Sequence, residues 1–242
     1  MAQQYEQLPF SKLLFLHLFP GAAIAFVFII LAYSMQSSEM PAVFWFFVAI
    51  PMGMIPTELG YLLYKGRKRN GHFSLHGILA YQNPLSWKQY LWTVPVTFLS
   101  MLILLTLAGT ADSWFYTNIF GWLPSWLNIE LLDAADISKP LLLIVAYLFN
   151  GLLGPIIEEL YFRGYLLPRM SAYGRWADLL HTFLFAIYHF WSPWRLIQRT
   201  IGVLPLPIAA KRSNLNVAII THVLLNTIGF TLTISGVLAA TS

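Results

Sequence analysis

Two adjacent carboxylates and an arginine stand at the end of a long apolar stretch. Glu158, Glu159 and Arg163 follow residues 140–157, in which Asn150 is the only strongly polar side chain. An ionisable group at membrane depth costs roughly 2.5 kcal/mol or more and is seldom placed there without a partner or a function. The four-residue spacing puts Glu159 and Arg163 on one helical face, where they can pair, and Glu158 points about 100° away. Spacing therefore predicts that Glu159 is the paired carboxylate and Glu158 the available one; a helix end with three snorkelling charges is the alternative.

Two further polar clusters lie in apolar stretches downstream. Phe185 precedes His189 by one helical turn, and His222 precedes Asn226 by the same spacing. Taken singly, a histidine or an asparagine in a membrane helix commonly links helices by a hydrogen bond, and Phe185 alone indicates packing. Taken together with Glu158, they have the parts of a hydrolase. A carboxylate and a histidine can activate a water, and a second histidine and an amide can stabilise an oxyanion.

Other catalytic arrangements have weaker support. The chain has no cysteine, which excludes cysteine proteases, zinc fingers and thiol redox chemistry. Neither His-Glu-x-x-His nor Gly-x-Ser-x-Gly occurs, so a zincin or a serine triad is unsupported. We therefore expect no cofactor and no metal. Two alternatives stay open: a His₂Glu zinc site of Glu158, His189 and His222, and a transporter that uses Glu158 and His189 as a proton relay.

The composition is that of a membrane protein. Hydrophobic residues make up 58% of the 242 residues and charged residues only 10%, against about 25% charged in soluble domains. The net charge of +4 is small, and the basic residues cluster in short segments, which suits membrane orientation better than nucleic-acid binding. No cleavable signal peptide is evident. We expect a multi-pass integral membrane protein whose partner is the lipid bilayer, with no nucleic acid.

The fold class predicted from these apolar stretches is all-α, a transmembrane bundle of about seven to eight helices. The fifth and sixth spans are short. In a simple up-and-down topology Glu158 lies near the inner end of span four, whereas His189 lies late in an outward span. The two can meet only if span four continues past Glu158, or if span five is short or re-entrant. The expected spans cover residues 10–33, 41–64, 89–108, a fourth that begins at 140, and then 177–191, 196–210 and 216–240.

Charge asymmetry predicts the orientation of the bundle. The segment 65–69 (Lys-Gly-Arg-Lys-Arg) is the strongest positive cluster, so the positive-inside rule places it and the N-terminus in the cytoplasm. The segment 109–139 has Lys139 as its only Lys or Arg and is rich in aromatic residues, which is typical of an external interfacial belt. Its acidic residues are Asp112, Glu130, Asp133 and Asp136.

The three motifs, in this order and within hydrophobic spans, resemble a known family. It is the CAAX protease and bacteriocin-processing (CPBP, Abi) family of intramembrane glutamic endopeptidases, which is related to the CAAX prenyl endopeptidase. The resemblance covers about residues 140–230, and residues 1–139 match nothing that we can name. The motifs are Glu-Glu-x-x-x-Arg (Glu158, Glu159, Arg163), Phe-x-x-x-His (Phe185, His189) and His-x-x-x-Asn (His222, Asn226).

The resemblance implies a helical-bundle protease with a catalytic core at 140–242. The apolar stretches and the charge pattern predict that N-terminal transmembrane helices with an external aromatic-rich loop, at 1–139, precede this core. It implies that Glu158 and His189 activate a water and that His222 and Asn226 form the oxyanion hole. The substrate would be a membrane-associated protein or peptide, and the location a bacterial cytoplasmic membrane. A non-catalytic membrane scaffold or a bacteriocin-immunity protein is the alternative. The implied supporting residues are Glu159, Arg163 and Phe185.

Overall fold

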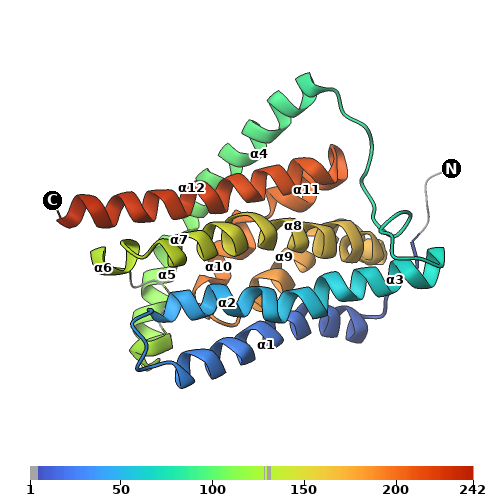
Figure 1. Cartoon of the computed structure of the whole chain (residues 1–242). Helices are drawn as coiled ribbons and strands as arrows, with labels where there is room; N and C mark the ends of the chain where they lie inside the picture. Colours follow the sequence, from blue (N-terminus) through green and yellow to red (C-terminus); the bar gives the residue numbers. More distant parts are fainter. Residues whose placement is uncertain (1–4, 128, 130–131, 242) are drawn as a thin grey trace.

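The computed structural model describes residues 5–127, 129 and 132–241, and these form helices joined by turns and loops (Figure 1). Glu130 of the predicted external segment lies outside the described residues. Among those described, five helical runs are long and apolar enough to cross a membrane. The structure therefore confirms an all-α polytopic bundle. The five runs are Phe10–Ser34, Ala42–Asn70, Trp87–Phe120, Pro140–Tyr188 and Leu215–Ala240.

The first runs agree closely with the predicted spans. They carry large exposed apolar side chains, such as Phe26 in the first run and Leu107 in the third, as expected for surfaces that face lipid. A π-helical turn at Ile55–Leu59 interrupts the second run. The elements of this part are α1 (Phe10–Ser34), α2 (Ala42–Met54), η1 (Ile55–Leu59), α3 (Gly60–Asn70), α4 (Trp87–Ala108), α5 (Thr110–Phe115), η2 (Tyr116–Phe120), η3 (Ser125–Leu127) and α6 (Ala134–Ile137).

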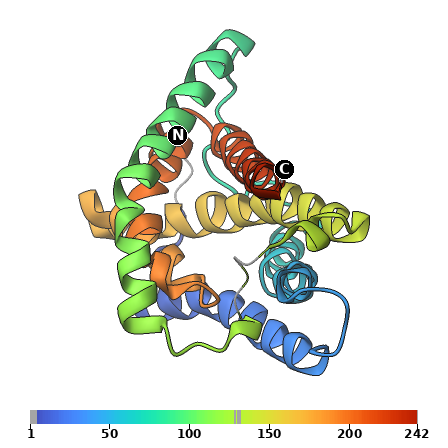
Figure 2. The ribbon, with the colours of Figure 1, turned by 90° about the vertical axis from the view of Figure 1, so that its left-hand side faces the viewer.

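The fourth run crosses the middle of the molecule, with α12 (Leu215–Thr241) on one side and α1 and α2 on the other (Figure 2). It consists of a first helical leg (residues 140–173), a turn at Gly174, which has a positive φ of 55°, and the returning helix α9, which is only 12 residues long. Twelve residues rise about 18 Å, well short of a bilayer's thickness. Its elements are α7 (Pro140–Val145), η4 (Ala146–Leu153), α8 (Gly154–Glu158), η5 (Glu159–Leu166), η6 (Leu167–Trp176) and α9 (Ala177–Tyr188).

This run resolves how the two predicted catalytic residues can meet. The first leg continues eight residues beyond Glu158, through η5 to Leu166. Helix α9 ends at Tyr188, just before His189. Both conditions expected from the sequence are thus present, a continued span four and a short span five. As a result Glu158 and His189 line one cavity.

The region expected as a short span at 196–210 is two helices, each too short to cross a bilayer. They follow the 3₁₀ turn η7 (Pro193–Arg195). The first packs on α4, where the Gln198 amide donates to the Leu105 carbonyl at 3.1 Å. The second leads into the last long helix. These elements are α10 (Leu196–Gly202), α11 (Pro205–Arg212) and α12 (Leu215–Thr241).

Helix α1 is held tightly against the end of α9. A Cβ atom at Gly21 would collide with the backbone carbonyl of Tyr188, so glycine permits this close approach. Deeper in the bundle, the buried rings of His17 and His181 share a hydrogen bond of 3.0 Å, and the Tyr161 hydroxyl donates to the Leu16 carbonyl at 2.8 Å. The N-terminal helix therefore helps to fix where α9 ends.

The predicted cytoplasmic segments gather at one end of the bundle. The connector after α3 pairs with η5 through the Ala80 amide and the Gly164 carbonyl, 2.9 Å apart. It also pairs with the start of α12, where the Leu215 amide donates to the Tyr81 carbonyl at 2.7 Å. The basic end of α3 thus lies on the same side as the turn before α12, which agrees with a single cytoplasmic face.

Accessibility of introduced cysteines tests this orientation. We expect Lys68→Cys, at an exposed position, to react with a membrane-impermeant maleimide only after the membrane is opened, because the basic cluster lies in the cytoplasm. Ala135→Cys, on the predicted external segment and also exposed, is the matched control and should react in intact cells. The native chain has no thiol that would obscure the result. External labelling of Lys68→Cys would overturn the orientation.

Candidate active site

A fully buried ion pair lies at the centre of the bundle. The Arg163 Nη1 atom is 3.0 Å from Glu159 Oε1, and both side chains have no exposed surface. The Arg163 guanidinium also lies over the Phe185 ring, 4.0 Å from its centroid, a favourable cation–π arrangement for a desolvated cation. The pairing predicted from the four-residue spacing is therefore present, and Phe185 contributes more than packing.

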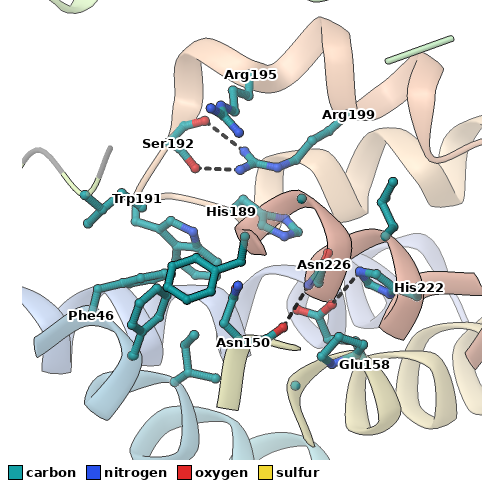
Figure 3. Close-up of a pocket in the computed structure, with 18 of the residues that line it drawn as sticks. Phe46, Asn150, Glu158, His189, Trp191, Ser192, Arg195, Arg199, His222 and Asn226 are labelled. Carbon is teal, nitrogen blue, oxygen red and sulfur yellow. Dashed lines mark hydrogen bonds and ion pairs between the residues drawn. The ribbon is translucent and has the colours of Figure 1, made fainter. Parts of the chain in front are cut away.

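His222 connects the two glutamates. Its Nδ1 atom is 2.8 Å from Glu159 Oε1, and its Nε2 atom is 3.8 Å from Glu158 Oε2 (Figure 3). Because a carboxylate only accepts hydrogen bonds, the Nδ1 atom carries a proton and donates a hydrogen bond to Glu159. The glutamate pair spans the junction of α8 and the π-helix η5. Such π-bulges occur frequently at functional sites.

His189 lies at the end of α9, where the backbone leaves the helix (φ −81°, ψ 60°). Its Nδ1 atom is 2.8 Å from the Phe185 carbonyl, which fixes the proton on Nδ1 and leaves Nε2 as the acceptor. The following turn is held by Arg199, which donates to the Ser192 carbonyl at 2.9 Å and to its hydroxyl at 2.7 Å. The imidazole is thus presented as a neutral acceptor of fixed orientation.

Asn226 lies one turn beyond His222 on α12. Its amide donates to the Asn150 carbonyl at 3.0 Å, which links α12 to η4. A primary amide has two N–H donors, so this bond fixes the amide plane and leaves a second donor. Asn150 itself was noted in the sequence only as the single polar side chain of its apolar stretch.

One cavity of about 620 Å³ brings the four predicted catalytic residues together (Figure 3). It is largely apolar and aromatic, and it extends from the glutamate toward Ile129 and Leu132 of the predicted external segment. Polar groups that converge in an otherwise apolar cavity are typical of a binding or catalytic site. Besides the four predicted catalytic residues, the polar lining residues are Asn150, Ser192, Arg195, Gln198, Arg199 and Thr233. The lining includes Phe46 and Phe47 of α2, Phe149 of η4, and Trp191, together with Glu158, His189, His222 and Asn226.

The chemistry available here is hydrolysis by an activated water. A carboxylate and an imidazole acceptor line the cavity together with an amide and a second imidazole, the groups that general-base catalysis and oxyanion stabilisation require. A zinc site of Glu158, His189 and His222 was the alternative. Among the described residues, no three His, Asp or Glu side chains lie close enough together to hold a metal ion.

The structure adds two residues that motif spacing did not identify. Glu58 has no exposed surface, and its Oε1 atom shares a hydrogen bond of 2.9 Å with the Tyr188 hydroxyl. Two signals were available in the sequence, a glutamate inside an apolar span and a tyrosine directly before His189. Neither signal shows that residues 130 positions apart meet.

Part of the chain is similar to a known protein family. Residues 140–228 match a family model described as "Type II CAAX prenyl endopeptidase Rce1-like". This segment is therefore similar to the Rce1-like family. The match confirms the family resemblance inferred from the three motifs, and the Rce1-like segment contains every residue of those motifs. No curated protein and no solved structure matches the chain.

Paired substitutions test the different roles of the two glutamates. Glu159→Gln should leave Arg163 buried without its counter-charge, and breaking a buried pair typically costs ~3–5 kcal/mol. That variant should be produced poorly or melt at a clearly lower temperature in detergent. Glu158→Gln keeps the shape of a side chain that has no such partner, and it should melt close to the wild type. The assignment is reversed if Glu158→Gln unfolds while Glu159→Gln stays folded.

Proposed function

We propose that the protein is an intramembrane glutamic endopeptidase that hydrolyses a peptide bond of a membrane-associated protein or peptide. The Rce1-like match supports the coarser statement, a CAAX-type intramembrane protease in a lipid bilayer. The observation that carries the glutamic mechanism is the position of Glu158, His189, His222 and Asn226 around one buried cavity.

In the proposed reaction a water lies between Glu158 and the Nε2 atom of His189. Glu158 removes a proton from the water as the water oxygen attacks the carbonyl carbon of the substrate. His189 orients the water through a hydrogen bond. The tetrahedral intermediate then collapses. Glu158 passes the proton to the leaving nitrogen, the C–N bond breaks, and the products are a carboxylic acid and an amine.

The oxyanion of that intermediate would be bound by Asn226 and His222. Asn226 offers the N–H that its bond to Asn150 leaves unused. His222 would donate from Nε2 when both ring nitrogens are protonated, with its Nδ1 atom held by the Glu159 carboxylate 2.8 Å away. Donors fixed in this way need no reorganisation when the charge develops.

The substrate of the proposed reaction is an extended segment with apolar side chains, because aromatic and aliphatic residues dominate the cavity wall. We propose residues 140–242 as the catalytic core and the helices within 1–139 as part of its wall, since α2 contributes Phe46 and Phe47. In a bacterial cytoplasmic membrane, small peptides and the tails of membrane proteins would be the natural candidates.

Comparative proteomics of membranes tests the function and separates a protease from a non-catalytic scaffold. Membranes that contain the wild type should show new peptide termini that disappear with Glu158→Ala, because the base is lost. Glu39→Ala removes an exposed carboxylate from the turn between α1 and α2 and is the control that should retain these termini. Identical termini with the wild type and Glu158→Ala would contradict a glutamic protease and favour the scaffold.

Chelation tests the proposed independence from metal. Cleavage of a peptide identified in this way should proceed at the same rate after treatment with a strong zinc chelator, because a carboxylate base and hydrogen-bond donors suffice for the proposed chemistry. The measurement is the initial rate before and after dialysis against the chelator. Loss of activity that stoichiometric zinc restores would instead establish a His₂Glu metalloprotease.

A further inference from the structure

Glu58 is a third buried carboxylate beside the candidate active site. It lies in the π-helical turn η1 between α2 and α3, outside the Rce1-like segment. It has no exposed surface and is not among the residues that line the cavity. Its Oε1 atom shares a hydrogen bond with the Tyr188 hydroxyl, and among the described residues its Oε2 atom has no hydrogen-bond partner. A buried carboxyl in this position calls for a physical explanation.

Tyr188 connects Glu58 to the candidate catalytic carboxylate. Its ring is buried and lines the cavity directly beside His189. Its hydroxyl is 2.9 Å from Glu58 Oε1, and it also lies near enough to Glu158 for the two groups to interact. One phenol therefore lies between two carboxyl groups that come from different parts of the chain.

Charge balance indicates which protonation state Glu58 takes. The groups that interact electrostatically with it are Glu158, Tyr161, Arg163 and Tyr188. Arg163, the one cation among them, is paired with Glu159 at 3.0 Å. An ionised carboxylate buried without a counter-ion is strongly disfavoured. Glu58 is therefore the neutral acid of this cluster.

The protonation state decides the direction of the hydrogen bonds. A phenol has one proton to donate. If Glu58 were ionised, the Tyr188 hydroxyl would donate its one hydrogen bond to Glu58. Glu158 would then receive no hydrogen bond from the phenol. With Glu58 as a neutral acid, the carboxyl O–H donates to the Tyr188 oxygen, and the phenol proton turns toward Glu158. The second arrangement leaves only a carbonyl oxygen of Glu58 without a partner, which is tolerated better than an unpaired donor.

We propose that Glu58 is a positioning residue of the active site, which as a neutral acid holds the Tyr188 hydroxyl so that it donates to Glu158. This role rests on the proposed function. A hydrogen bond to the ionised carboxylate favours that form, and the ionised form is the one that accepts a proton from water. The Glu58–Tyr188 pair thus keeps Glu158 ionised, and so able to act as a base, at lower pH. Through Glu58, the N-terminal helices contribute to the proposed chemistry.

The pH profile of kcat/KM tests this role. The groups that face Glu158 and influence its titration are His222, Arg163, Glu159 and Tyr188. Tyr188→Phe removes the donor, so the acid limb should move to higher pH and kcat should fall roughly tenfold, the usual scale for a hydrogen bond to a charged group. Glu58→Ala should do the same, with KM little changed. Glu58→Gln, whose amide can replace the acid O–H as donor, should restore the wild-type profile.

Two outcomes of that experiment would overturn the proposal. An acid limb that moves to lower pH in Glu58→Gln would mean that Glu58 is ionised and repels charge on Glu158. An unchanged profile in a folded Glu58→Ala variant would mean that its role is only structural. If Glu58→Ala does not fold, Tyr188→Phe and Glu58→Gln still give a decision.

Infrared spectroscopy supplies a readout that does not depend on protease activity. At neutral pH the purified wild type should show the C=O stretching band of a protonated carboxylic acid, and Glu58→Gln should lose it. A band that persists unchanged in Glu58→Gln contradicts a neutral Glu58. If the band is lost but Glu158→Gln leaves peptide cleavage intact, the proposed glutamic mechanism fails while the protonation of Glu58 stands.

Discussion

The buried ion pair between Glu159 and Arg163 is the interaction on which the site depends. Two full charges without exposed surface are tolerated only where nearby groups satisfy them, and removing one partner of such a pair is costly. The groups that contact the pair come from two other helices, Phe185 over the guanidinium and His222 at the carboxylate. The pair therefore fixes α9 and α12 relative to η5, and the rest of the cavity is built on these three elements.

The division of labour between the glutamates follows from this arrangement. Because Glu159 is held by both Arg163 and His222, it is a poor candidate for a base. Glu158 is its neighbour in sequence but points into the cavity, where it lies 3.8 Å from the His222 Nε2 atom. A single peptide step thus separates a carboxylate that stabilises the fold from one that remains available for chemistry, as the helical rotation per residue requires.

Local patterns predicted what depends on local geometry. Apolar length located α1 at residues 10–33, against Phe10–Ser34 in the structure, and four-residue spacing predicted the Glu159–Arg163 pair. Spacing could not show that α9 is only 12 residues long, because an apolar stretch does not reveal where a bundle lets a helix end. Nor could it show that His222 donates to Glu159, or that Glu58 meets Tyr188. Those contacts join residues 63 and 130 positions apart, and tertiary packing alone determines them.

The N-terminal helices are part of the site even though they lie outside the Rce1-like segment. Helix α2 supplies aromatic wall residues of the cavity, and Gly21 of α1 permits the close contact at Tyr188 that positions the end of α9. Glu58 reaches the same tyrosine from the other side of that contact. Since His189 directly follows Tyr188, a shift of α1 or η1 would be transmitted to the imidazole by the backbone itself. The motifs supply the reacting groups, and the helices before residue 140 supply the constraint that holds one of them in place.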